Sequence, residues 1–183
     1  MGETNNILSE TFTKEALKLY NIEFDLGFSL EEIEQEIIIR TQNGKPFFKS
    51  IPLEFSISHS ENIWVCAMGS CRVGIDIQIE KSAKTLEIAK RFFNKEESDF
   101  VTEYGSKAFF QIWSMKEAFV KFIGKGISYG FDTFSVVVDG KIVDSMENPI
   151  KCYFQKIELT EALECYICTL KKEKVHKRNL CKL

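Results

Sequence analysis

The chain has 183 residues, 44% hydrophobic and 13% aromatic, enough to bury a core in one domain or in two small half-domains that share it. Its 24 Lys and Arg residues nearly balance 27 Asp and Glu residues, and a net charge of −3 argues against a nucleic-acid-binding protein. No apolar run approaches the roughly 18 residues that span a membrane, so we expect no membrane insertion.

The amino-terminus lacks the charged-then-apolar pattern of a secretion signal, so we expect a cytoplasmic protein with reduced thiols. Cys165 and Cys168 have the spacing of a redox or zinc pair, but their surroundings are typical of a strand, on which residues three apart face opposite sides. No second Cys/His pair has suitable spacing, so we expect neither use. The basic tail Lys171–Leu183 is interpreted as a solvated end, with contact to an acidic partner as the alternative.

The first part of the chain predicts two helical segments and a hairpin. Apolar residues on one side predict a helix over Glu10–Tyr20. Ser29 and Glu32 have the spacing of a capping box, which opens a second helical turn. The β-branched run Glu36–Thr41 predicts a strand that turns at Asn43-Gly44, a dipeptide typical of hairpins.

The rest of the chain predicts strands on either side of a helical middle. Three strands are predicted over Phe55–Ser58, Ile63–Met68 and Val73–Ile79. A helical stretch from about Thr85 to Glu103, broken near Asn94, precedes the longest helix, from about Ser106 to Ile123, which the glycines at 124 and 126 end. Further strands are predicted over residues 134–138, 141–143, 151–159 and 163–170, with Asp139-Gly140 as a second hairpin turn.

Helix followed by antiparallel strands occurs twice, so the predicted fold class is α+β with two related halves. Each half is expected to pack a helix on a small antiparallel sheet. We place the boundary just before Val73, which gives half-domains over residues 1–72 and 73–183.

Two polar residues interrupt the apolar pattern of the third predicted strand. Val73, Ile75 and Ile77 point one way, whereas Asp76 and Gln78 point the other. Asp is disfavoured within strands, so its presence requires a reason. Asp76 and Gln78 either lie on a solvated face or point at a common ligand.

The longest predicted helix carries Trp113, Glu117 and Lys121 four residues apart, beside its apolar face. A Glu-to-Lys pair at this spacing is usually only a surface ion pair. Mg²⁺, however, binds one or two carboxylates plus substrate phosphates, which Asp76 and Glu117 would supply. Lys121 would then neutralise charge on a phosphate leaving group.

Three further residues are candidate phosphate contacts. Ser58 and His59 lie in the segment F-S-I-S-H-S, and Lys45 follows the predicted turn. The alternatives are a packed strand histidine and a solvated hairpin lysine. The chain has no Walker loop, dinucleotide fingerprint, nucleophile elbow or zinc pattern, so any nucleophile is expected to arrive with the substrate.

These residues resemble the Sfp-type 4'-phosphopantetheinyl transferases. The family signature G-[IV]-D-x-[E], followed by W-[ST]-x-K-E-[AS]-x-x-K, here reads G-I-D-I-Q and W-S-M-K-E-A-F-V-K. F-S-I-S-H-S matches a third motif, N-G-K-P resembles the family's Y-G-K-P, and L-E-I-A-K-R-F-F is also similar. The resemblance covers roughly residues 42–134 and implies the fold of that family, with the first half shortened.

The resemblance implies transfer of the phosphopantetheine arm of coenzyme A to a serine of an apo acyl or peptidyl carrier protein, releasing adenosine 3',5'-bisphosphate. Asp76, Glu117 and Gln78 are then metal ligands for Mg²⁺, with Gln78 where the family often has Glu. Glu117 and Lys121 are the catalytic residues. The contacts to coenzyme A are expected from Lys45, Ser58, His59 and Lys121.

The first half-domain is accordingly expected to contact coenzyme A phosphates, and the second to hold the metal and meet the carrier near residues 124–131. Two fused halves favour a monomer. The pathway served, whether fatty-acid, polyketide or nonribosomal peptide synthesis, is left open. The competing hypotheses are a non-catalytic relative that binds coenzyme A or a carrier without turnover, and a different Mg²⁺-dependent phosphoesterase or nucleotide-binding enzyme.

Overall fold

A computed structural model describes residues 2–147 and 149–180. Its helices are α1 (Gly2–Phe24), α2 (Leu30–Gln35), α3 (Thr85–Phe92) and α4 (Lys95–Ile123), with the 3-10 helices η1 (Ile127–Tyr129) and η2 (Phe131–Thr133). Its strands are β1 (Ile38–Arg40), β2 (Pro46–Phe48), β3 (Glu54–Ser60), β4 (Ile63–Gly69), β5 (Val73–Ile79), β6 (Val137–Val138), β7 (Lys141–Ile142), β8 (Ser145–Met146), β9 (Cys152–Lys156) and β10 (Leu163–Thr169). The end of the basic tail, residues 181–183, lies outside the described residues.

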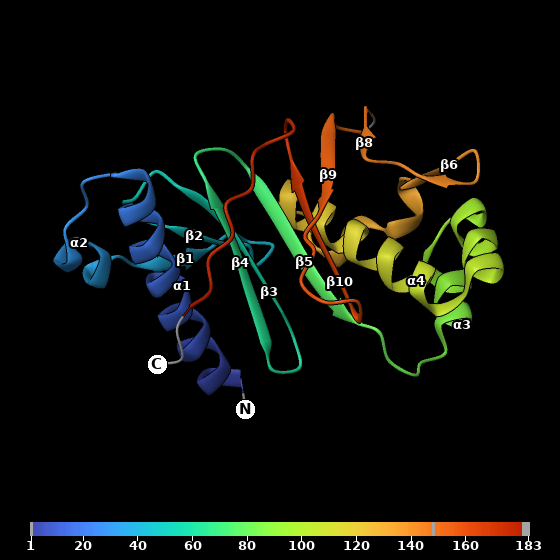
Figure 1. The fold of residues 1–183 in the computed structure, drawn as a ribbon, viewed down its shortest axis with the longest axis horizontal. Coiled ribbons are helices and arrows are strands. Elements are labelled where there is room, and N and C mark those ends of the chain that lie inside the picture. The colour runs from blue at the N-terminus through green and yellow to red at the C-terminus, as the bar shows by residue number, and fades with distance from the viewer. Residues whose placement is uncertain (1, 148, 181–183) are drawn as a thin grey trace.

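The strands form small antiparallel sheets with the orders β1-β2, β3-β4, β5-β10-β9-β8 and β6-β7. In Figure 1, α1 lies at one end of the molecule, α3 at the other, and the strands β3, β4, β5, β10 and β9 occupy the middle. The predicted α+β class is therefore confirmed. The order helix, short hairpin, long hairpin occurs twice: α1, β1-β2 and β3-β4, then α4, β6-β7 and β9-β10.

Local sequence signals placed most turns and caps correctly. The capping box is confirmed, because Ser29 Oγ accepts from the Glu32 backbone N–H and Glu32 Oε2 accepts from the Ser29 backbone N–H at 2.7 Å. Asn43-Gly44 joins β1 to β2, and Asp139-Gly140, both at positive φ, joins β6 to β7. The first helix is longer at both ends than the predicted Glu10–Tyr20.

Element α4 comprises the second part of the predicted helical stretch and the longest predicted helix, joined at Gly105. Asn94 caps its first turn by accepting from the Glu97 N–H at 2.9 Å, which confirms the predicted break. Gly105 has a non-helical backbone (φ 79°), so one helical segment stops before it and the next starts after it, which confirms the predicted start of the longest helix near Ser106. Gly124, in the left-handed conformation at φ 70°, ends the helix as predicted.

Apolar side chains form three clusters, under α1, between α4 and its sheet, and between the two long hairpins and β5. Cys165 belongs to the third of these and Cys168 to the second, so the expected opposite orientation of the two thiols is confirmed. Burial raises the pKa of Cys165 to about 12, which keeps this thiol protonated.

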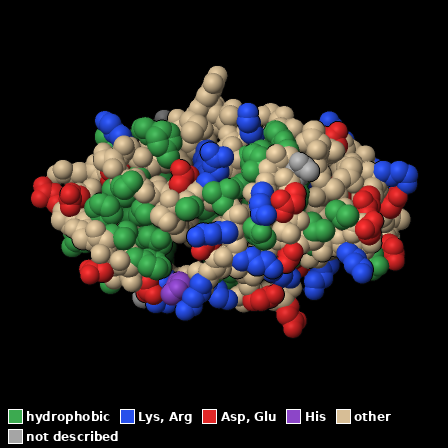
Figure 2. Space-filling model, turned by 90° about the horizontal axis from the view of Figure 1, so that it is seen from above, with side chains coloured by type: hydrophobic (Ala, Val, Ile, Leu, Met, Phe, Trp, Pro, Cys, Tyr) green, Lys and Arg blue, Asp and Glu red, His purple; other side chains and the backbone are tan. Residues whose placement is uncertain are grey.

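The face of the molecule seen in Figure 2 mixes positive and negative charges over most of its length. Figure 2 shows hydrophobic side chains gathered at the end where α1 and α2 lie, whereas Lys, Arg, Asp and Glu are interspersed elsewhere. Exposed apolar side chains of this end include Ile22, Leu30 and Ile37, which are 75%, 65% and 52% exposed. Within the described residues, no helix combines the length and the apolar character that crossing a membrane requires.

Candidate active site

Gly74 brings strand β5 into direct contact with helix α4. A Cβ atom at this position would lie 2.0 Å from the Ala118 carbonyl oxygen and 2.4 Å from the Phe122 nitrogen, so only a hydrogen fits. Side chains two residues apart on a strand share a face. Asp76 therefore also faces α4, opposite the helical turn that carries Glu117 and Lys121.

The Asp76 carboxylate is 2% exposed and receives hydrogen bonds on both oxygens. Oδ1 accepts from Ser58 Oγ and from Lys121 Nζ, each at 2.7 Å, and Oδ2 accepts from Gln78 Nε2 at 2.8 Å. Ser114 Oγ, on α4, donates to the Asp76 backbone carbonyl at 3.0 Å. A buried charge is tolerated only when it is paired and hydrogen-bonded, and Asp76 meets both conditions.

Glu117 is a second buried carboxyl group, 9% exposed, one helical turn before Lys121. Burial raises the pKa of Glu117 to about 7, and the negative charge of Asp76 acts in the same direction, while Lys121 acts against them. The group therefore holds its proton more tightly than an exposed glutamate does. A carboxyl group whose pKa is raised toward neutrality can exchange a proton at physiological pH, and such raised pKa values are typical of functional sites.

Three serines of β3 join strand β3 to strand β5. The hydroxyls of Ser56, Ser58 and Ser60 accept from the backbone N–H groups of residues 75, 77 and 79, at 3.1, 3.4 and 3.2 Å. Side-chain hydroxyls thus take the place of a backbone ladder between β3 and β5. Ser58 both holds β5 in place and orients Asp76.

The remaining candidate contacts lie around this seam without touching Asp76. His59 is exposed on β3, opposite Trp64 of β4. Lys45 Nζ donates to the Val73 carbonyl at 3.2 Å and lies 3.4 Å from Glu54 Oε2, and burial lowers its pKa. The structure therefore brings Ser58, Gln78 and Lys121 onto Asp76, whereas Lys45 reaches only the first residue of β5.

Three supporting features were not predicted from the sequence. Gly74 carries the strand-to-helix contact, and a glycine inside a strand is the signal that indicates such a close approach. Ser114 occupies the [ST] position of the W-[ST]-x-K-E motif, but the motif alone did not indicate its contact with Asp76. Lys116 and Glu97 are fully buried and form an ion pair of 2.8 Å, although Lys116 directly precedes Glu117 in the sequence.

Residues 72–170, more than half of the chain, match the sequence profile of the 4'-phosphopantetheinyl transferase superfamily. The chain belongs to this superfamily. The matched segment contains Asp76, Gln78, Glu117 and Lys121, whereas Lys45, Ser58 and His59 precede it.

Two curated members of the superfamily align with most of this chain. The 4'-phosphopantetheinyl transferase psf-1 of Bacillus pumilus is 38% identical over 146 residues, which cover 75% of this chain and 62% of the relative. The 4'-phosphopantetheinyl transferase Sfp of Bacillus subtilis (strain 168) is 37% identical over 156 residues, which cover 79% of this chain and 63% of the relative. The chain thus spans less than two thirds of the length of these relatives.

The donor set of this superfamily member fits a hard divalent cation. Among the described residues, no three or more His, Cys, Asp or Glu side chains are grouped so that they could hold a metal by themselves. Mg²⁺ needs only one or two protein carboxylates when substrate phosphates supply further oxygens. Asp76, Glu117 and the amide oxygen of Gln78 meet this requirement, with one Asp76 oxygen shared at present between Ser58 and Lys121.

Proposed function

We propose that the protein transfers the 4'-phosphopantetheine arm of coenzyme A to a serine hydroxyl of an apo acyl or peptidyl carrier protein. The serine oxygen forms the new bond to phosphorus, the bond to the bridging pyrophosphate oxygen breaks, and adenosine 3',5'-bisphosphate leaves. The observation that carries the proposal is the buried pair of carboxyl groups, Asp76 and Glu117, beside the Lys121 ammonium, within the segment that matches the superfamily.

Glu117 is proposed as the group that accepts the serine proton. Burial raises its pKa to about 7 in the absence of metal, so the carboxylate is a stronger base than an exposed glutamate. Lys121 is proposed to neutralise the departing phosphate. Its side chain is 28% exposed and is held by Asp76 and by the Ile75 carbonyl, so the ammonium is oriented yet open to a ligand.

Asp76, Glu117 and Gln78 are proposed to hold Mg²⁺. When bound, the cation supplies charge neutralisation and orientation of the pyrophosphate. Ser58, His59 and Lys45 are proposed to contact phosphates of coenzyme A. His59 is exposed and available for this role, whereas Ser58 Oγ already bonds Asp76 and Lys45 Nζ already bonds the Val73 carbonyl.

Intact-mass analysis of a purified apo carrier protein tests the proposal. The carrier is incubated with this protein, coenzyme A and Mg²⁺, and we expect a mass gain of one phosphopantetheine arm. The gain should disappear when the metal is chelated and with Glu117→Ala. Glu103→Ala, an exposed position on the same helix, is the matched control and should retain transfer.

A non-catalytic relative that binds coenzyme A or a carrier is the second candidate. It is favoured by the saturation of Asp76, whose two oxygens already accept from Ser58, Lys121 and Gln78. This candidate predicts binding of coenzyme A, measurable by calorimetry, with no mass gain on any carrier at any Mg²⁺ concentration. A mass gain that depends on Glu117 would eliminate it.

A further inference from the structure

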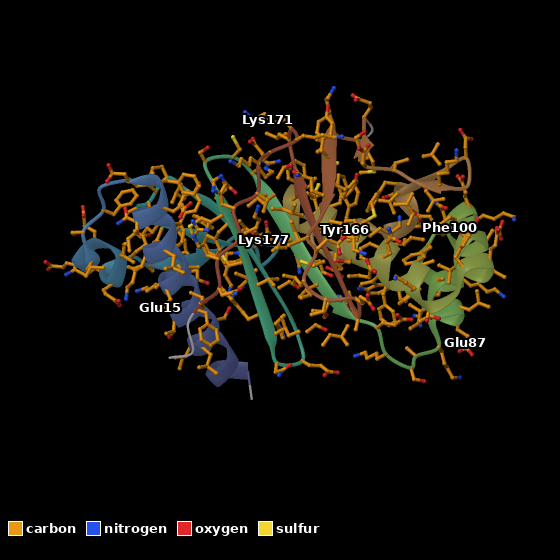
Figure 3. The ribbon with its side chains drawn as sticks, in the orientation of Figure 1. Glu15, Glu87, Phe100, Tyr166, Lys171 and Lys177 are labelled. Carbon is orange, nitrogen blue, oxygen red and sulfur yellow. The ribbon has the colours of Figure 1, made fainter. Side chains whose placement is uncertain are left out.

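Glu164 on β10 is a buried carboxylate beside the proposed Mg²⁺ ligands that the proposed reaction does not use. It lies directly opposite Gln78 in the register of β10 and β5, and the next pair on the same face is Tyr166 and Asp76. Tyr166, labelled in Figure 3, shows that this face lies against α4, because its hydroxyl accepts from Gln111 Nε2 at 2.7 Å. Glu164 therefore projects from the same face of the sheet as Asp76 and Gln78.

One oxygen of the Glu164 carboxylate has no hydrogen-bond donor among the described residues. The residue is 2% exposed, and its Oε1 accepts from Lys156 Nζ at 3.0 Å. Oε2 lies 2.9 Å from the same nitrogen, outside hydrogen-bonding geometry, and accepts no hydrogen bond from the described chain. Lys156 thus balances the charge of Glu164 but does not satisfy Oε2. A buried polar atom in this state costs free energy, so it requires an explanation.

Gln78 carries the amide group that can supply the missing donor. Its Nε2 donates to Asp76 Oδ2 at 2.8 Å, so the NH₂ group faces the carboxylate that is proposed to bind Mg²⁺. An amide binds a cation only through its oxygen, because the NH₂ group offers only hydrogen-bond donors. Ligation by Gln78 therefore requires its NH₂ group to leave Asp76 and to find another acceptor.

The cross-strand geometry makes Glu164 that acceptor. Opposite residues of an antiparallel pair have Cβ atoms about 4.5–5.5 Å apart, and both side chains are long enough to meet across this distance. The carboxylate of Glu164 is already buried beside Gln78, so no further charge must be removed from water when the two groups meet.

We propose that Glu164 is a positioning residue for Gln78. Its Oε2 accepts from the Gln78 NH₂ group when the amide oxygen turns toward the metal. This exchange frees Asp76 Oδ2, whose hydrogen bond in the metal-free protein comes from Gln78, and it gives the buried Oε2 its donor. The inference rests on the proposed function through its metal site, and it assigns to Glu164 the orientation of a ligand and not a bond to the metal.

Binding of Mn²⁺ in the presence of coenzyme A tests this role without a carrier protein or turnover. Mn²⁺ prefers the same oxygen ligands as Mg²⁺, and the electron paramagnetic resonance signal of the free ion measures the bound fraction. Glu164→Met removes the acceptor and should weaken Mn²⁺ binding at least about tenfold, as loss of a group that orients a metal ligand typically does. Glu161→Met, at an exposed position in the turn before β10, is the matched control and should bind Mn²⁺ like the unchanged protein.

A second background separates positioning from a merely structural role. The carboxylate that Gln78→Glu introduces needs no acceptor and repels Glu164, so adding Glu164→Met there should leave Mn²⁺ binding unchanged or tighten it. Glu164→Gln keeps the shape and one neutral acceptor oxygen, so it should lose only about threefold, and this loss should also vanish in that background. Lys156→Met breaks the ion pair but keeps the acceptor, and it should not weaken Mn²⁺ binding.

The results that would overturn the role of Glu164 differ from those that would overturn the transfer reaction. The role is refuted if neither Glu164 variant weakens Mn²⁺ binding, or if both weaken it equally in the Gln78→Glu background. It is also refuted if Lys156→Met weakens binding as much as Glu164→Met, or if the unchanged protein binds no Mn²⁺ with coenzyme A. The expected Mn²⁺ results without a mass gain on any carrier would refute transfer alone.

Discussion

Lys121 Nζ on α4 lies 2.7 Å from Asp76 Oδ1 on β5, and this ion pair joins the two motifs through residues that are 45 positions apart in the sequence. The carboxylate is almost fully buried, while 28% of the lysine side chain remains exposed. The pair is therefore asymmetric. Hydrogen bonds from Ser58 and Gln78 hold the Asp76 carboxylate in place. The Lys121 side chain is partly exposed, so its ammonium can contact both Asp76 and a bound ligand.

Replacement of Lys121 by Met should reduce transfer far more than it reduces stability. We expect at least about a hundredfold loss of transfer rate, since one positioned charge at a reacting phosphate contributes several kcal/mol. The folded state should lose only about 1–3 kcal/mol, because Ser58 and Gln78 continue to bond Asp76. Carrier mass gain over time and urea unfolding measure the two effects. Lys107→Met, at an exposed position on α4, is the control. A Lys121→Met rate within about threefold of that of the unchanged protein would remove Lys121 from the reaction.

Gly74→Ala should separate β5 from α4 and disable the site without touching a charged residue. The added methyl would lie 2.0 Å from the Ala118 carbonyl oxygen, so strand and helix must move apart. We expect a loss of about 3 kcal/mol or more in unfolding free energy. Gly69→Ala on β4 is the matched control, because its methyl would meet nothing closer than 3.9 Å. Equal melting temperatures for the two variants would contradict the role assigned to Gly74.

The sequence predicted the local elements well because the signals are local. Each of these signals depends on residues within a few positions of one another. They are the capping box at Ser29, the Asn43-Gly44 turn, the Asp139-Gly140 turn and the alternation in β5. The seam between β3 and β5 was not predictable in the same way. A run of alternating serines looks like any half-polar strand, and only the neighbouring strand shows that the hydroxyls of Ser56, Ser58 and Ser60 replace a backbone ladder.

The candidate site was predicted as a set of residue types, and the structure adds their mutual contacts. That Asp76 and Lys121 form a direct pair, and that Gln78 donates to Asp76, required the packing of α4 on β5. The buried Lys116 was missed because a lysine beside Glu117 in a helix indicates a solvated face. Its burial depends on Glu97 and on residues 131–136, which are distant in sequence.

Gln78→Glu should lower the Mg²⁺ concentration that gives the half-maximal transfer rate. The substitution replaces a neutral amide, now 2.8 Å from Asp76 Oδ2, with a third carboxylate beside Asp76 and Glu117. Added negative charge strengthens binding of a divalent cation. A Mg²⁺ titration of the initial rate measures the effect, with Gln78→Ala as the comparison. An unchanged half-maximal concentration for both variants would exclude Gln78 as a ligand.

Lys116→Met should destabilise the fold by about 3–5 kcal/mol, because it leaves the Glu97 carboxyl group buried without its partner. Lys116 Nζ also donates to the carbonyls of Phe131 and Phe134, at 2.6 and 2.7 Å. The double variant Lys116→Met/Glu97→Gln should lose less than the sum of the single losses, since no unpaired charge remains. Urea unfolding of the unchanged protein, both single variants and the double variant measures the coupling free energy between Lys116 and Glu97. Strictly additive losses would show that the two residues act independently of each other.

Glu117→Gln should stabilise the metal-free protein at pH 8 and have little effect at pH 4. Burial beside Asp76 raises the pKa of Glu117 from 4.5 to about 7, so the folded state holds its proton more tightly than the unfolded chain does. Below pH 4.5 both states are protonated and the folded state bears no penalty. As the pH rises from 4.5 to 7, this stability is lost, by up to about 3 kcal/mol.

Urea unfolding in the presence of a chelator, repeated from pH 4 to pH 8, measures this difference between variant and unchanged protein. The gain from Glu117→Gln should grow through the interval from pH 4.5 to 7 and then level off. Glu103→Gln, at an exposed position on α4, corrects for the loss of a surface charge from the same helix. A gain that is constant over the whole range would mean that Glu117 titrates alike in both states, and the group would then be too acidic to retain a serine proton near neutral pH.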